Sequence, residues 1–246
     1  MGLLGERKWR QEYECEFLTE ELTLIDGDVV RKSEIAARER IKAGEHIKLS
    51  LNNDRFRFFE VPKKGAVYLV SADPSTGSGR DNGVVQVFEF PAMVQVMEYT
   101  TNTLSSHAFY TEMKSIIQFL ERFSDEVYFT VENNGVGQGI IAAYEGDISP
   151  PNAMLVSESG KLGFTTTNKS KMRACLQFKD LYERGRMTIH SVDLLTELKS
   201  FIRAGTAGYS AQIGATDDRV MAIIIMFYII QEISSNNASA YDMVIS

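Results

Sequence analysis

The amino-acid sequence predicts an α/β protein in which helices flank a mixed central sheet. Three runs rich in β-branched and aromatic residues come first and are separated by turn residues: Ala66–Ala72, Val84–Phe90 and Met93–Tyr99. A helical repeat, one further apolar run and a second helical repeat follow. This order predicts three antiparallel strands and a fourth strand that joins them in parallel after a right-handed crossover.

The first strand follows the turn residues at Val61–Gly65, and we place the main domain boundary near Glu60. The preceding residues 1–60 are dense in charge and form a linker or accessory segment, with one helix at Ser33–Ala43 that Ser33 caps. The main domain is expected to span residues 61–246.

The middle of the chain is regular. Phe109, Met113, Ile116 and Leu120 recur at helical spacing and predict a helix over 107–122, capped by Ser105 or Ser106. The run Val127–Val131 predicts the fourth strand, and residues 135–144 predict a second crossover helix.

The pattern is weaker beyond Pro151. We expect a helix from a cap at Asn168 to Glu183, ended by Gly185, and a buried, nearly all-apolar helix over 216–233. Before the first of these helices we expect short strands at 154–156 and 162–164. Between the two helices we expect a strand at 187–190, helical turns at 192–198, and a strand or loop at 207–212.

Composition limits the class of protein. The chain has 246 residues, of which 44% are hydrophobic and 24% charged, as in a soluble protein with one substantial core. Only Cys15 and Cys175 occur, which supports neither a disulfide framework nor a zinc site and fits a reducing, intracellular setting. The longest apolar run, Val220–Ile230, is shorter than the roughly 20 residues of a membrane span.

Acidic residues stand at three places where elements begin or end. Asp73 and Glu132 each follow an apolar strand, and Asp217 and Asp218 open the last helix. Carboxylates at the rim of a sheet lie on a rigid scaffold and remain open to ligands. A set of oxygen ligands suits Mg²⁺ or Mn²⁺, whose charge would offset their repulsion.

The two adjacent aspartates cannot both point at one ion, because consecutive helical residues project about 100° apart. We favour Asp218 as the inner ligand, while Asp217 caps the helix or holds a metal-bound water. Asp81 lies eight positions after Asp73 and is either a further ligand or a turn residue of Asp81-Asn82-Gly83.

Basic residues gather in one part of a chain whose net charge is −7. Residues 161–186 contain seven Lys or Arg against two acids, a local balance of +5. We expect contacts to the DNA backbone, with weak sequence preference, from Lys161, Lys169, Lys171 and Arg173. The alternative is a solvated helix face. Arg80, in a glycine-rich loop, either meets a phosphate or only helps to reverse the chain.

The element order and its carboxylates resemble the ribonuclease H-like fold of nucleases, resolvases and integrases. Three segments, SADPSTGSGRDN, VENNG and TDDRVMA, resemble the nuclease motifs of the large terminase subunit of tailed bacteriophages, in the same order. WRQEYECEF resembles the stretch that follows the ATPase core of that family, and the T-even type is nearest. No GxxxxGK followed by Ser or Thr occurs here, so we expect a fragment without the ATPase domain.

This resemblance implies an Mg²⁺- or Mn²⁺-dependent DNA endonuclease that cuts concatemeric viral DNA during genome packaging. Asp73, Glu132, Asp218 and Asp217 would be its catalytic residues and, with Asp81, its metal ligands. Double-stranded DNA, the portal protein and the small terminase subunit would be its partners, in the host cytoplasm and transiently at the portal of the prohead. Two alternatives remain open: a DNA-gripping, portal-docking module with weak nuclease activity, or a resolvase or ribonuclease of the same fold.

Overall fold

The structure is a computed structural model and describes residues 22–44, 56–79, 81–124, 126–152, 160–205 and 208–236. Five strands form the central sheet in the spatial order β1-β4-β3-β2-β5. Only the β2–β5 pair is parallel within this sheet, which is therefore mixed, as predicted. The strands are β1 (Phe56–Phe58), β2 (Val67–Asp73), β3 (Gly83–Phe90), β4 (Val94–Thr101) and β5 (Val127–Val131).

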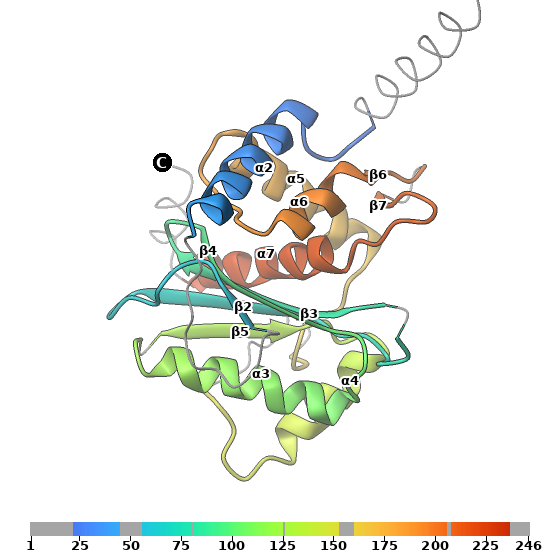
Figure 1. The fold of residues 1–246 in the computed structure, drawn as a ribbon. Helices are drawn as coiled ribbons and strands as arrows, with labels where there is room; N and C mark the ends of the chain where they lie inside the picture. Colours follow the sequence, from blue (N-terminus) through green and yellow to red (C-terminus); the bar gives the residue numbers. More distant parts are fainter. Residues whose placement is uncertain are drawn as a thin grey trace, which may run out of the picture.

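Helices cover both faces of the sheet (Figure 1). Helices α3 and α4 lie on one face; α7 lies on the other, and α2, α5 and α6 lie beyond it (Figure 1). Their bounds are α2 (Gly27–Lys42), α3 (Ser106–Glu121), α4 (Val136–Glu145), α5 (Asn168–Glu183), α6 (Val192–Lys199) and α7 (Asp218–Asn236). A separate two-stranded sheet pairs β6 (Phe201–Arg203) with β7 (Tyr209–Ala211).

Each face of the sheet has its own hydrophobic core. On the α3 side, Met113, Ile116 and Ile117 pack against sheet residues such as Val70. On the other side, α7 is buried among α2, α5, α6 and the sheet, which explains why its sequence is apolar on nearly every side. Among the described residues, no helix is both long and apolar enough to span a bilayer.

The central elements match their sequence predictions closely. The fourth strand is confirmed at Val127–Val131, and Ser105 caps α3 by accepting the N–H of Ala108. The end of α5 is confirmed too, since Gly185 follows it with a φ of 72°, a value that glycine adopts easily.

Several boundaries and short elements were predicted wrongly. Helix α2 begins six residues before Ser33, at Gly27, because Asp26 accepts the N–H groups of Asp28 and Val29. Thr167, rather than Asn168, caps α5. The segments 162–164 and 187–190 form isolated bridges instead of strands, and the strand expected at 154–156 lies outside the described residues.

The division near Glu60 stays a prediction. Strand β1 precedes Glu60 and pairs with β4 in the central sheet. Helix α2 packs on α6 and buries Val30 and Ala37 in the same core as α7.

Candidate functional site

Two predicted site residues lie side by side at one edge of the central sheet. Asp73 ends β2 and Glu132 follows β5, and these strands are adjacent and parallel with Ala72 opposite Val131. The N–H of Glu132 also donates to the carbonyl of Ala72 at 3.2 Å. The parallel register therefore brings the two carboxyl-bearing residues together, as the sequence pattern predicted.

The beginning of α7 carries the other two acids. Asp217 is the N-cap, because its carbonyl accepts the N–H of Met221 at 2.7 Å. One turn further on, the hydroxyl of Ser71 on β2 donates to the carbonyl of Ala222 at 2.6 Å. This buried bond ties the first turns of α7 to the strand that ends at Asp73.

Asp217 and Asp218 are held by different loops. The Asp217 carboxylate accepts the N–H of Ala211 at 3.1 Å. The Asp218 carboxylate accepts the backbone N–H of Asn82 at 2.9 Å and its side-chain amide at 3.3 Å. Asp218 thus fastens the loop between β2 and β3 to the start of α7.

The charges of the other three acids act on Asp73. The pKa of Asp73 is raised well above its usual value, chiefly because burial penalises its charged form. The charges of Glu132, Asp218 and Asp217 raise it further, in that order, and Lys171 lowers it. Each of the three acids therefore lies within electrostatic reach of Asp73.

The loop after β2 brings a fifth acid to the same edge. The pKa of Asp218 is raised, first by burial and then by the charges of Asp81 and Asp217, while the hydrogen bonds from Asn82 lower it. Asp81 is exposed, so it lies at the outer rim of the group. Arg80, the loop residue expected to meet a phosphate, lies outside the described residues.

Glu132 is held by the segment that follows it. The side-chain amide of Asn134 donates to the Glu132 carboxylate at 3.1 Å, while that of Asn133 donates to the carbonyl of Leu162 at 2.8 Å. At Gly137 an added Cβ would lie 1.5 Å from the carbonyl oxygen of Glu132. Only glycine allows α4 to begin this close to Glu132.

The donor set fits a divalent cation. Carboxylates that offer only acceptor oxygens and repel one another are suited to a hard cation such as Mg²⁺ or Mn²⁺. Within the described residues, no three His, Cys, Asp or Glu side chains are arranged as a ready-made ligand group. The carboxylates of Asp217, Asp218 and Glu132 instead accept hydrogen bonds from neighbouring amides.

The predicted DNA-contacting residues occupy two different environments. Lys161, Lys169 and Arg173 are exposed, whereas Lys171 is half-buried. The Lys171 ammonium lies over the ring of Phe201, 5.5 Å from its centroid. It also lowers the pKa of Asp73, a relation that the sequence did not predict because it depends on how α5 packs.

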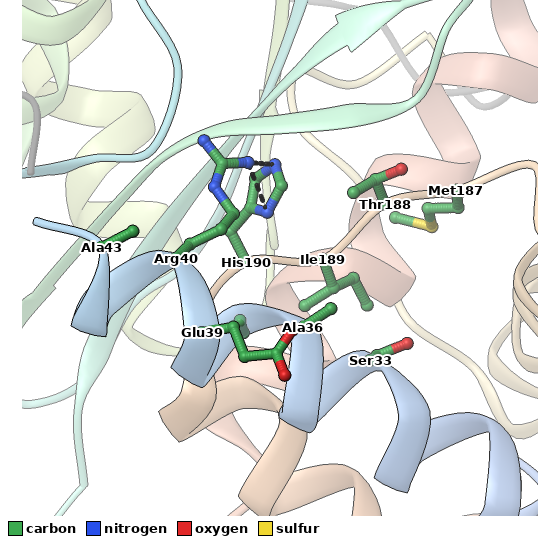
Figure 2. A pocket seen from close by; sticks show the side chains of 10 residues that line it. Ser33, Ala36, Glu39, Arg40, Ala43, Met187, Thr188, Ile189 and His190 are labelled. Carbon is green, nitrogen blue, oxygen red and sulfur yellow. Dashed lines mark hydrogen bonds between the residues drawn. The ribbon is translucent and has the colours of Figure 1, made fainter. Parts of the chain in front are cut away.

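A separate pocket lies between α2 and residues 187–190 and has a volume of about 510 Å³ (Figure 2). One Arg40 nitrogen lies 3.0 Å and 2.8 Å from the two ring nitrogens of His190, and 2.8 Å from Glu60 (Figure 2 shows the contacts to His190). None of the predicted site residues lines this pocket. His190 thus belongs to a different part of the molecule from the carboxylate group.

The protein has the ribonuclease H-like arrangement, a five-stranded mixed sheet between helices. Its solved structural neighbours include the large terminase nuclease from the thermophilic phage G20c. The match has a TM-score of 0.53 and 13% sequence identity, and covers 74% of this chain and 90% of that chain.

Metal-bound forms of the same phage G20c nuclease match equally well. The form with bound magnesium has a TM-score of 0.54 at 17% identity, and the form with bound cobalt 0.52 at 16%. Each match covers 74% of this chain and 89% of the neighbour. No family model matches the sequence. At these identities the similarity establishes the fold alone.

Proposed function

We propose that the protein is an endonuclease that hydrolyses DNA phosphodiester bonds with the help of a divalent cation. The observation that carries this proposal is the convergence of Asp73, Glu132 and the Asp217–Asp218 pair at one edge of the sheet. Their mutual repulsion is what a bound cation would relieve. The fold shared with large terminase nucleases supports the same function.

The acidic residues at this edge would have different roles in metal binding. Asp73, Glu132 and Asp218 would hold the cation, and Asp217 and the exposed Asp81 would complete the acidic surroundings. When bound, Mg²⁺ or Mn²⁺ supplies Lewis acidity at the scissile phosphate and neutralises developing charge. The amides of Asn82, Ala211 and Asn134 orient the carboxylates before any ligand arrives.

The biological role follows from the three motifs at Asp73, Glu132 and Asp217–Asp218. We infer that the enzyme cuts concatemeric viral DNA during genome packaging, as the nuclease part of a large terminase subunit of the T-even type. Its partners would be double-stranded DNA, the portal protein and the small terminase subunit. It would work in the host cytoplasm and transiently at the portal of the prohead.

Cleavage of supercoiled plasmid tests the proposal. The wild-type protein should nick or linearise the plasmid with Mg²⁺ or Mn²⁺ and leave it intact with EDTA. Asp73→Asn and Asp218→Asn should both lose cleavage while keeping the wild-type circular dichroism spectrum. Asp28→Asn is the matched control, because Asp28 is exposed on α2 and pairs with Arg31. Metal-dependent cutting that survives in Asp73→Asn would refute the assignment.

A DNA-gripping module is the second candidate, and the exposed positions of Lys169 and Arg173 favour it. These residues stand one turn apart on α5, so they share a face that can contact consecutive phosphates. A DNA-gripping function predicts that duplex DNA binds without metal and that this binding weakens strongly in the Lys169→Glu, Arg173→Glu double variant. Binding of this kind by a folded wild type that never cuts would favour this candidate. A preference for branched DNA or RNA–DNA hybrids would instead indicate a resolvase or ribonuclease.

A further inference from the structure

Helix α7 begins without using the side chain of its own N-cap residue. An aspartate at the N-cap ordinarily accepts the N–H of the second or third helical residue. In α7 these residues are Arg219 and Val220, because Asp218 is the first. The Asp217 carboxylate accepts the N–H of Ala211 instead. Another group must therefore satisfy the first turn of this buried helix.

Glu197, on the neighbouring helix α6, is that group. One of its carboxylate oxygens accepts the N–H of Arg219 at 2.8 Å and the N–H of Val220 at 3.3 Å. Its other oxygen accepts the hydroxyl of Thr216 at 3.3 Å and an Arg219 guanidinium N–H at 2.8 Å. Glu197 is only 6% exposed, so both oxygens are fixed by these bonds.

Arg219 keeps Glu197 in place from the other side. Its guanidinium lies between Glu197 and Glu98 of β4, with its Nε 3.3 Å from Glu98. Glu98 is fully buried, and its other oxygen accepts the side-chain amide of Gln86 at 3.0 Å. The cap is thus part of a buried network anchored in the central sheet, so it cannot swing away at low cost.

We propose that Glu197 is a positioning residue of the carboxylate site: it caps α7 in place of Asp217 and thereby leaves the Asp217 carboxylate available near Asp73. The inference rests on the proposed function, because it assigns the freed carboxylate to the same metal site. If Glu197 were lost, the nearest replacement cap would be Asp217 itself. The helix would then withdraw one acid from the site.

Hydrogen exchange tests the capping step without reference to metal or cleavage. The amide N–H groups of Arg219 and Val220 should be equally protected in the wild type and in Asp217→Asn, because Glu197 accepts both. The loss of a helix cap speeds amide exchange by about five- to tenfold. Exchange of these two amides that much faster in Asp217→Asn than in the wild type would overturn the proposal. This variant keeps the buried network intact and is expected to fold.

Calorimetric titration with Mn²⁺ alone tests the positioning step. In the wild-type background, Asp217→Asn should weaken Mn²⁺ binding by about tenfold or more. In Glu197→Gln the amide at position 197 caps α7 less well, so Mn²⁺ binding should already be weaker than in the wild type. Adding Asp217→Asn to this variant should then weaken binding by a smaller factor than it does in the wild-type background. Thr196→Ala, exposed on the same helix, is the matched control and should bind as the wild type does.

The two measurements separate this proposal from the proposed function. Equal factors for Asp217→Asn in both backgrounds would overturn the positioning role of Glu197. If the wild type bound no Mn²⁺ at all, the metal-dependent function would fail and the positioning role with it. The hydrogen-exchange result would then still decide whether Glu197 caps α7.

Discussion

Replacing Arg219 by methionine should lower the free energy of unfolding by about 3 kcal/mol. The Arg219 side chain is 13% exposed, and its guanidinium contacts Glu197 at 2.8 Å and Glu98 at 3.3 Å, two carboxylates that the fold buries. Removing one partner of a buried ion pair costs about 3–5 kcal/mol because a charge is left without its counterion. The lower end applies, since Arg57 lies 3.9 Å from Glu98 and compensates part of its charge.

The loss should depend on pH in a defined direction. Burial raises the pKa of Glu197, and Arg219 lowers it, so the variant raises this pKa further in the folded state. A carboxyl group whose pKa is raised in the folded state stabilises the fold fully at a pH below its pKa in the unfolded state. This contribution is lost as the pH rises through its pKa in the folded state. The difference between Arg219→Met and the wild type should therefore be larger at about pH 8 than at about pH 5.

Urea unfolding followed by circular dichroism measures this loss, with EDTA present so that metal binding plays no part. Arg184→Met is the matched control, because the Arg184–Asp180 pair is 2.8 Å apart but more than half exposed. Such a surface pair contributes about 0–1 kcal/mol. If Arg219→Met cost no more than Arg184→Met, the idea that Arg219 compensates two buried charges would be refuted.

Three further predictions concern other parts of the fold. Hydrogen bonds, chiefly from Lys114, lower the pKa of Asp147 to about 2, so its stabilising effect is lost as the pH falls. In Asp147→Asn the thermal stability should therefore decrease less between about pH 4 and 2 than it does in the wild type. Gly137→Ala should reduce both stability and metal-dependent cleavage, since the new Cβ would lie 1.5 Å from the Glu132 carbonyl oxygen. Burial raises the pKa of the Cys175 thiol to about 12. In a Cys15→Ser variant this thiol should therefore react with a thiol reagent only as fast as the protein unfolds, which mass spectrometry would measure.

Each of these predictions has a clear opposite result. An unchanged pH profile in Asp147→Asn would mean that the Lys114 bond does not stabilise the fold. Gly146→Ala is the control for Gly137→Ala, since its Cβ would lie 3.4 Å from the nearest atom and should be tolerated. Rapid labelling of Cys175 in the native protein would contradict its burial.

The central sheet could be predicted because local pattern and tertiary structure agree there. The run Val127–Val131 consists of β-branched and aromatic residues, is bounded by polar residues and is covered by helices, so it forms the expected strand. Strands β1 and β6 were not predicted, because three residues carry little periodicity and pair only where the fold supplies a partner. The true start of α2 was missed because Ser33 is also a good cap, and only packing selects Asp26.

The nearness of Asp73 and Glu132 could be predicted for a similar reason. Asp73 and Glu132 sit at strand ends, and the alternation of element types fixes which strands are neighbours. The groups that orient these acids left no local signal in the sequence. Glu197 lies twenty residues before Asp217 on an ordinary amphipathic helix, and its role as a cap depends on how α6 meets α7.

Helix α5 shows why a count of charges could not identify a DNA-binding surface. Lys169 and Arg173 are four residues apart and share an exposed face, whereas Lys171 lies between them and projects about 200° away. That rotation turns Lys171 inward, over Phe201, where its charge acts on Asp73. Further along, Lys179 and Arg184 are paired with Glu183 and Asp180. The basic residues of α5 therefore serve different purposes. Lys169 and Arg173 form an exposed pair suited to phosphate contacts, whereas Lys171 partly offsets the repulsion among the carboxylates.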